Sequence, residues 1–463
     1  MKKIHLWLIV FVSVVMTWGS AASAAQLLFT PRATVTEKYS DNIYLTNKDK
    51  KDDFITTPTI GFTAEVPGQT TGVSLSYDGG YNFYADNDEN DGWQHTALGS
   101  FWHNFTRDTR LDITNSFLYT KDPLSNRDVV NQQGNVAAPG DYSSRQRLNT
   151  YYRDYSTTRL THQFGPENSV YGQFVYGFLK NNSDQYQDSQ EISPSVGMTY
   201  WWSTWTGIEL EGNYLRGLYS GSGGQDATNN QDGTAEDDFN QVSGRVRLNH
   251  RLTPTFGIFE QYRQIYRNYD GNQAGQTQND DGQLNQDYLV YAPSVGVFYQ
   301  FDPTLTASLG VGYFYQQVQN GKDQQGPFPT AEINKLWDYQ RWNVRARGTA
   351  GLGSQDFSAE NEGFTRYAQI DLLGRYNFTR QFFGDAGITY RYSDYINSED
   401  DQVDHFLSPN VGLGYNIFRW MALRLSYTYN KLVATNNSTD DYEENSVLFT
   451  VTLQPDQPWR VWD

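Results

Sequence analysis

The sequence predicts an all-β protein: a single closed antiparallel transmembrane β-barrel of about 20 strands. First, apolar and polar residues alternate with period two, so that Met421, Leu423 and Leu425 alternate with Ala422 and Arg424. Second, short and long connections alternate along the chain. Third, aromatic residues make up 16% of a chain that is only 38% hydrophobic, with 34 Tyr and 12 Trp. This composition is expected where only one face of each strand is apolar and that face meets lipid.

The N-terminal segment 1–24 predicts a secretory signal peptide. "MKK" is a short basic region, "LWLIVFVSVVM" is an apolar run, and "ASA" at 22–24 permits cleavage after Ala24. The alternative is a membrane anchor, but the flanking residues and the small-residue site favour cleavage. The expected barrel then spans 25–463. There is no later apolar run of the roughly 20 residues that a membrane helix needs. The absence of cysteine excludes disulfides and cysteine metal sites.

The connections predict which end of the barrel faces which side of the membrane. Tight turns such as "FGPEN" at 164–168 contrast with long acidic segments such as "GSGGQDATNNQDGTAEDD" at 221–238. In bacterial outer-membrane barrels, short turns face the periplasm and long loops face outward, and an even strand number leaves both termini periplasmic. The expected location is therefore the bacterial outer membrane. Aromatic residues at the tight turns predict an interfacial girdle: Phe105, Trp202, Trp205, Phe301, Trp342, Phe378 and Trp420.

Strand boundaries follow from these turns and from the alternation. The segment near 328–339 has the weakest strand pattern, and without it 342–354 would join a long loop and the barrel would have 18 strands. The expected strands span about 28–46, 54–66, 70–84, 92–106, 109–121, 144–164, 168–180, 189–202, 205–219, 238–252, 254–269, 286–301, 304–318, 328–339, 342–354, 363–377, 383–395, 403–416, 420–432 and 445–454.

One strand type repeats with an internal proline. "YAPSVGVFYQF" at 291–301 is similar to "ISPSVGMTYWW" at 192–202, "LSPNVGLGYNIF" at 407–418 and, more faintly, "TPTIGFTAEV" at 57–66. Proline cannot donate to a strand ladder. Its place about nine residues before a tight turn predicts a level near the outer edge of the apolar band, where water or a bulge compensates. The glycine three residues later is expected to face the lumen: Gly197, Gly296 and Gly412.

Charge is segregated along the chain, whose formal net charge is −18. Acidic residues crowd the long loops, whereas arginines occupy the inward positions of the expected strands. A wall of guanidinium groups attracts anions and binds carboxylates or phosphates in bidentate fashion. The expected lumen-lining residues are Arg145, Arg147, Arg153, Arg159, Arg245, Arg247, Arg251, Arg263, Arg267, Arg345, Arg347, Arg375, Arg391 and Arg424.

Two further expectations concern these arginines. Arg245, Arg247, Arg345 and Arg347 are expected on separate strands at comparable depth, where two or more of them would line one constriction. The alternative is that luminal acids neutralise the wall through ion pairs. The candidate acids are Asp112, Glu209, Glu211, Asp371 and Asp385.

The stretch "FTPRATVTEKYSDNIYLT" at 29–46, with Pro31 followed by Tyr39-Ser40-Asp41-Asn42-Ile43-Tyr44, resembles the opening of a family of outer-membrane β-barrel porins. Members of that family often accompany exopolysaccharide assembly systems. The resemblance implies an exit pore for a secreted polysaccharide and supplies no catalytic residues. Because no periplasmic domain accompanies the expected barrel, a separate periplasmic export protein would be needed. A general or solute-specific diffusion porin is the alternative. The ending "PDQPWRVWD" departs from barrels that finish with an aromatic residue on the last strand.

Catalysis, cofactors and nucleic acid are not expected. The chain has no G-x-S-x-G or H-E-x-x-H motif, and the mature histidines are scattered. Outer-membrane lipid and lipopolysaccharide are the expected surroundings. The Asp/Asn-rich segments 226–238 and 277–287 suggest loose Ca²⁺ bridging to lipopolysaccharide without a defined metal site, since they lack the EF-hand spacing. The loops expected to cover or enter the mouth are 122–144, 220–238, 270–286 and 319–330.

Overall fold

The structure is a computed structural model that describes most of the chain after the N-terminal segment. Residues 1–25, including the predicted signal peptide, lie outside the described residues, so that prediction stays a prediction. The described ranges are 26–122, 148–183, 188–220, 238–270, 287–302, 304–319, 321–354, 364–396, 402–435 and 441–461.

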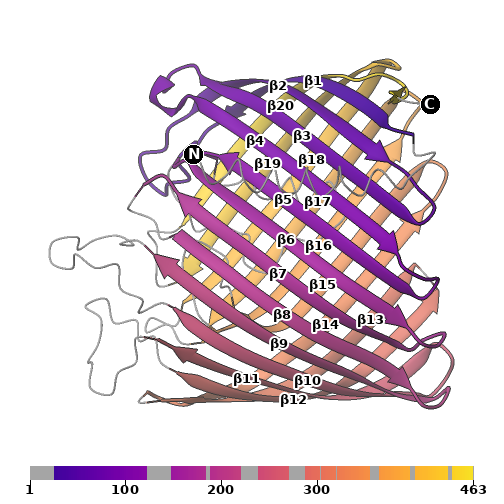
Figure 1. Ribbon diagram of the computed structural model, residues 1–463. Coiled ribbons are helices and arrows are strands. Elements are labelled where there is room, and N and C mark those ends of the chain that lie inside the picture. The colour runs from indigo at the N-terminus through magenta and orange to yellow at the C-terminus, as the bar shows by residue number, and fades with distance from the viewer. Residues whose placement is uncertain are drawn as a thin grey trace.

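Twenty long antiparallel strands close into one barrel, which confirms the predicted fold class. Each strand pairs with the next along the chain, and β1 pairs with both β2 and β20, so that no edge is left between the first and last strands. The short connections gather at one end of the barrel, and the strands run inclined to its axis (Figure 1). We call this end the tight-turn end and the opposite end the loop end.

The bounds of the strands agree closely with the alternation in the sequence. They are β1 (Leu28–Ser40), β2 (Asp53–Val66), β3 (Thr71–Tyr84), β4 (Gly92–Asn104), β5 (Thr109–Thr120), β6 (Tyr151–Gln163), β7 (Ser169–Asn181), β8 (Asp188–Trp201), β9 (Thr206–Ser220), β10 (Phe239–Arg251), β11 (Phe256–Tyr269), β12 (Tyr288–Asp302), β13 (Leu305–Val318), β14 (Gln324–Asp338), β15 (Trp342–Ser354), β16 (Phe364–Asn377), β17 (Phe382–Tyr395), β18 (Val403–Phe418), β19 (Met421–Thr435), β20 (Tyr442–Leu453) and the short β21 (Trp459–Arg460). A short 3-10 helix, η2 (Asp88–Asn90), lies between β3 and β4.

Three boundaries differ clearly from the sequence prediction, and one of them is the start of β6 at Tyr151 instead of near residue 144. β14 is a full strand from Gln324, so most of the segment 319–330, expected as a loop at the mouth, is wall. β1 ends at Ser40 instead of near residue 46. The chain turns there because the Asn42 side-chain amide donates to the backbone carbonyls of Thr46 and Glu443, and Leu45 adopts a positive φ of 52°.

The two faces of the strands differ as the alternation requires. On β10, Val242 and Val246 are exposed on the outward face, whereas Gln241, Arg245 and Asn249 point inward. Exposed aromatic rings gather beside the tight turns, where they form the expected girdle, and the side chain of Phe301 lies outside the described residues. The exposed rings of this girdle are Phe105, Trp202, Trp205, Phe378 and Trp420.

The repeated prolines interrupt the ladder without shifting it. Each proline pairs with the preceding strand, as Pro293 does with Tyr262, but pairing with the following strand lapses for two residues. The same lapse occurs at Pro58, Pro194 and Pro409, and the register on either side is unchanged. Of the two expected compensations, water and a bulge, the unchanged register excludes the bulge at these positions. The registers place a tyrosine opposite each proline: Tyr81, Tyr214, Tyr313 and Tyr429.

Side-chain hydrogen bonds bridge three of the four lapses on the inward face. Thr57, which precedes Pro58, donates its hydroxyl to Asn82 Oδ1 at 2.8 Å. Ser408, which precedes Pro409, donates to Asn430 Oδ1 at 2.6 Å. The hydroxyl of Ser193, which precedes Pro194, accepts from Asn213 Nδ2 at 2.8 Å. The hydroxyl before proline thus restores a cross-strand bond that the missing N–H cannot make.

The chain returns to the barrel seam after β20. β21 pairs with the first residues of β1, so that Trp459 lies opposite Phe29 with ring centroids 6.2 Å apart. The ending therefore departs less from other barrels than the sequence indicates, because an aromatic residue does stand on the last paired segment.

We expect Thr57→Val to lower the free energy of unfolding by about 1–3 kcal/mol, because the buried Asn82 Oδ1 would lose its donor. Urea-induced unfolding in lipid vesicles measures this. The matched control is Thr63→Val on the same strand, whose hydroxyl makes a longer, 3.2 Å bond to the half-buried Ser76. Equal losses in the two variants would contradict a special role for the bond beside proline.

Candidate functional site: the inner wall of the barrel

The twelve described arginines of the sequence prediction stand at strand positions that alternate with the exposed apolar residues. Arg145 and Arg147 lie outside the described residues. Arg245 and Arg247 share β10, and Arg345 and Arg347 share β15, so the expectation of four separate strands is wrong. The others are Arg153 and Arg159 on β6, Arg251 on β10, Arg263 and Arg267 on β11, Arg375 on β16, Arg391 on β17 and Arg424 on β19.

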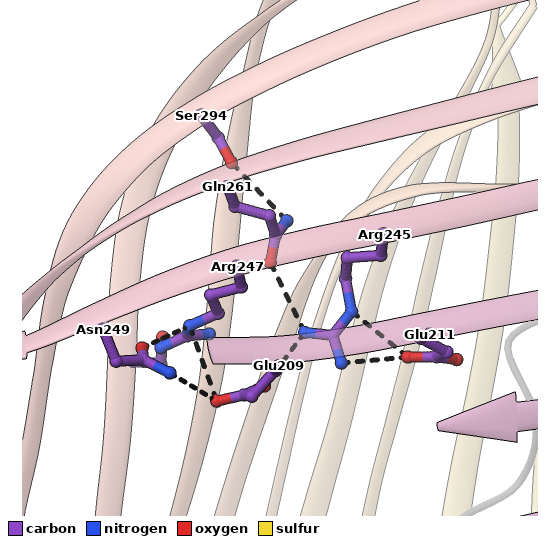
Figure 2. Close-up of polar contacts among 8 residues, drawn as sticks. Glu209, Glu211, Arg245, Arg247, Asn249, Gln261 and Ser294 are labelled. Carbon is purple, nitrogen blue, oxygen red and sulfur yellow. Dashed lines mark hydrogen bonds and ion pairs between the residues drawn. The ribbon is translucent and has the colours of Figure 1, made fainter. Parts of the chain in front are cut away.

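Arg245 is held by two carboxylates of the neighbouring strand β9 (Figure 2). Its Nη2 lies 2.9 Å from Glu211 Oε2, and its Nη1 lies 3.4 Å from Glu209 Oε2. Gln261 lies within reach of the same guanidinium and donates to Ser294 Oγ at 3.5 Å. The alternative that luminal acids neutralise the arginines therefore holds at this position.

Arg247 contacts Asn249 and Glu209 (Figure 2) and is also held by residues of β11 and β13. Its Nε donates to Asn249 Oδ1 at 2.9 Å, and its Nη2 donates to Ser308 Oγ at 3.1 Å. Its guanidinium carbon lies 3.9 Å from the centre of the Phe259 ring. Asn249 in turn donates to Glu209 at 2.7 Å, so Arg245 and Arg247 belong to one hydrogen-bonded network.

Several arginines lie flat against inward aromatic rings, a contact that suits the planar guanidinium. Arg267 has no exposed surface, and Arg391 is only 3% exposed. These two side chains are therefore part of the wall and are not positioned to touch a solute. The stacked pairs are Arg159 over Tyr171 at 3.7 Å, Arg251 over Trp201 at 3.8 Å, Arg267 over Phe239 at 3.9 Å and Arg375 over Phe383 at 4.3 Å.

Four arginines of the inner wall are less completely paired, namely Arg345, Arg347, Arg424 and the exposed Arg375. Arg345 is exposed and makes no hydrogen bond or ion pair with any residue that the structure describes. Arg347 Nε is buried and has no hydrogen-bond partner within the described chain. The Arg424 side chain is 47% exposed, although its Nη2 lies 2.6 Å from Asp385 Oδ2. The inner wall therefore presents positive charge at the exposed Arg345, whereas Arg347 stands directly opposite Asp371.

The end of the β15–β16 hairpin leaves the wall and enters the lumen. Pairing between β14 and β15 stops at Ala331 and Ala350, whereas β15 and β16 stay paired as far as Ser354 and Phe364. The Phe364 ring is 1% exposed. It lies 5.9 Å from two rings of the inner wall, those of Tyr288 and Phe314.

A hydrogen bond from β11, four strands away around the inner wall, secures this hairpin end. Arg263 Nη1 on β11 donates to the Leu352 carbonyl at 2.8 Å. On the other side, Arg366 Nη1 donates to the Pro327 carbonyl at 2.8 Å. The hairpin end therefore narrows the loop-end half of the lumen. The loops 122–144, 220–238 and 270–286, to which the sequence assigned this role, lie almost entirely outside the described residues. The buried Leu352 and Phe364, which border a polar loop, are the sequence signal that could have indicated it.

A bidentate ion pair lies at the tight-turn end. Arg251 donates to both carboxylate oxygens of Glu167 in the turn before β7, at 2.8 and 2.9 Å. These hydrogen bonds hold the pKa of the Glu167 carboxyl below its ordinary value. Glu167 therefore stays ionised at neutral pH and cancels the charge of Arg251.

Comparison with known families and structures identifies the family of the chain. The family described as "Putative beta-barrel porin 2" matches residues 205–455. The chain belongs to this porin family. No curated protein matched the sequence.

Solved outer-membrane barrels are similar to this porin in fold only. The outer membrane protein OpdK from Pseudomonas aeruginosa is 12% identical, with a TM-score of 0.37, and the match covers 92% of this chain and 99% of that one. The FrpB iron transporter from Neisseria meningitidis is 10% identical, with a TM-score of 0.49, and covers 92% and 82% respectively. OccAB3 from Acinetobacter baumannii is 11% identical, with a TM-score of 0.34 over 92% and 99%.

Family and fold together place this porin in the bacterial outer membrane. The porin family indicates a channel. Among the described residues, no helix has the length and apolarity needed to span a membrane. Within the same residues, no group of three or more histidine, aspartate or glutamate side chains is arranged to hold a metal ion.

We expect Phe364→Ala to raise single-channel conductance, because loss of the buried ring would loosen the hairpin end from Tyr288 and Phe314. Planar-bilayer recording measures this. The control is Phe383→Ala, which removes an inward ring that contacts Arg375 instead of the hairpin end. If both variants conduct like the unmodified protein, the hairpin end does not limit the channel.

Proposed function

We propose that this porin is an exit channel for a secreted acidic or hydroxyl-rich polysaccharide. The observation that carries the proposal is a file of arginines along β10 and β11. Arg251 lies at the tight-turn end, Arg247 and Arg245 follow on the same face, and Arg263 stands directly opposite Arg245 on β11. A continuous file is what a long, repeating anionic or polar cargo needs, since each unit meets the same chemistry along its path.

The chemistry of the file fits a glycan. A guanidinium presents a planar fork of donors that binds a carboxylate or two neighbouring hydroxyls without leaving its supporting ring. Trp201 and Phe259 hold two arginines of the file, Arg251 and Arg247, in fixed orientations. Fixed donors lose less conformational entropy on contact with cargo than mobile side chains would.

Ion pairing limits how strongly the wall selects anions. Glu209 and Glu211 offset Arg245 and Arg247, so these strands present donors with little net charge. The exposed Arg345 and the incompletely bonded Arg347 on β15 supply the charge that would attract anions. We infer a moderate anion preference that added salt weakens, with screening over about 10 Å at 0.1 M.

The orientation follows from the usual build of such barrels. We infer that the tight-turn end, where Leu28 of β1 and Arg460 of β21 lie side by side, faces the periplasm. A separate periplasmic export protein would deliver the polymer to this end. Lipopolysaccharide would surround the loop end.

A solute-specific diffusion porin is the second candidate, and the inward hairpin end favours it. A lumen narrowed by Phe364 and Leu352 suits a small solute at least as well as a polymer. The polysaccharide phenotype of a deletion strain separates the two. Loss of surface polysaccharide supports export, whereas unchanged polysaccharide with impaired uptake of a small anion supports the diffusion porin.

We expect Arg345→Gln with Arg347→Gln to shift the reversal potential in a salt gradient toward cations, because two positive charges leave the wall. Glu209→Gln with Glu211→Gln should shift it toward anions, since Arg245 would lose its counter-charges. Arg380→Gln, in an exposed turn between β16 and β17, is the control. Identical reversal potentials in all variants would remove these residues from the ion path.

The same variants test export in cells. We expect the β15 double variant to secrete less polysaccharide while folding normally, as judged by heat-modifiable migration on gels. If polysaccharide secretion stays unchanged while the reversal potential shifts, the protein is an anion channel and the polymer is not its cargo.

A further inference from the structure

A groove crosses the outward face of the barrel over β7–β11. It has a volume of about 540 Å³. One row of directly paired residues crosses it, in the order Gly172, Val196, Gly212, Gly244 and Gln264. Directly paired residues of an antiparallel sheet point to the same side. Three of the five positions in this row therefore present no side chain toward the membrane.

Nothing in the neighbourhood requires glycine at these positions. A Cβ atom added to Gly212 would lie 3.8 Å from Val196, and one added to Gly244 would lie 3.9 Å from the Glu211 carbonyl. A Cβ on Gly172 would meet no atom within 4 Å. Because larger side chains would fit, the glycines leave open space along the row.

Apolar side chains form the walls of this trough. Val170, Met198, Leu210 and Val246 border it on the tight-turn side. Pro194 and Tyr214 stand on the loop side, two residues along β8 and β9 from the row. The trough is therefore one row of side chains wide and is continuous with the apolar outer surface of the barrel.

The row changes level as it crosses the inclined strands. On β8 it lies at Val196, two residues on the tight-turn side of Pro194. On β12 its continuation lies at Tyr291, two residues on the loop side of Pro293. Since the prolines mark one level in equivalent strands, the row rises from the apolar belt at Gly172 to the proline–tyrosine level at Gln264.

The raised end of the groove is also its polar end. Gln264 Oε1 accepts a hydrogen bond of 3.3 Å from the Tyr262 hydroxyl. Farther toward the loop end, the outward positions Asn240 and Arg216 bind Asp270. The groove has apolar walls toward the tight-turn end and polar side chains toward the loop end. This arrangement matches the division of a membrane lipid into acyl chain and headgroup.

We propose that this groove binds one acyl chain of lipopolysaccharide, with the headgroup beside Gln264. The groove is continuous with the lipid-facing belt of the barrel. An apolar groove within that belt is filled by the lipid acyl chains that surround it, which identifies the occupant as an acyl chain. The outer-leaflet lipid is assigned because the polar end rises toward the loop end. This last step rests on the proposed orientation of the barrel, but not on its cargo.

The test compares purified variants by native mass spectrometry after incubation with lipopolysaccharide or with phosphatidylethanolamine. Gly212→Leu with Gly244→Leu fills the trough. Gly348→Leu is the matched control, since Gly348 also faces outward, on β15, and an added Cβ would lie 3.7 Å from Ile333. We expect the filled variant to retain lipopolysaccharide about tenfold less well than the unmodified protein and the control. Tenfold corresponds to about 1.4 kcal/mol, roughly the burial of two methylene groups.

A second measurement tests the proposal even if the filled variant folds poorly. The chain has no cysteine, so Met198→Cys in the groove and Val311→Cys on β13 can each carry one spin label. Lipopolysaccharide should slow the label at 198 and leave the label at 311 unchanged.

Three outcomes would overturn the proposal: equal lipopolysaccharide retention by the filled variant and the control, equal retention of phosphatidylethanolamine and lipopolysaccharide in the groove, or loss of a dimer instead of a lipid on filling. Channel conductance is measured in parallel. A failure of the lipid site with normal conductance leaves the proposed transport function intact.

Discussion

The structure depends on one constraint: inside a bilayer, every backbone N–H and C=O must find its partner within the protein. Twenty antiparallel strands satisfy it by closing on themselves through β1 and β20, and β21 extends this seam to the tight-turn end. Closure fixes the inward or outward direction of every side chain, because successive residues of a strand face opposite sides. The polar inner wall and the apolar outer surface are consequences of the same ladder.

The repeated prolines are local exceptions to this constraint. Each removes one donor, yet the ladder resumes in the same register, because the preceding strand stays fully paired through the proline. A hydroxyl before Pro58, Pro194 and Pro409 supplies a cross-strand hydrogen bond on the inward face. At these three positions the gap in backbone pairing is therefore compensated by a nearby side-chain hydrogen bond, and the register of the barrel is unchanged.

The inner wall combines polar chemistry with near neutrality. Opposite charges on β9 and β10 satisfy one another, and aromatic rings support other guanidinium groups, such as those of Arg159 and Arg375. Such a wall offers many fixed donors without a strong field, which suits a polar cargo that must enter and leave. The inward end of the β15–β16 hairpin adds a size restriction to this chemistry, and the two together define what the lumen admits.

The sequence by itself determined an antiparallel barrel of 20 or 18 strands, most strand boundaries and the alternation of arginines with apolar residues, because these depend on a period of two and on local turn chemistry. Tertiary structure alone decided which arginines are neutralised, since Arg245 meets Glu209 and Glu211 only through the register of β9 against β10. It also decided that β15 and β16 leave the wall, because this depends on Phe364 meeting Tyr288 and Phe314 from distant strands. Cross-strand partners depend on register and closure, which no single stretch of sequence specifies.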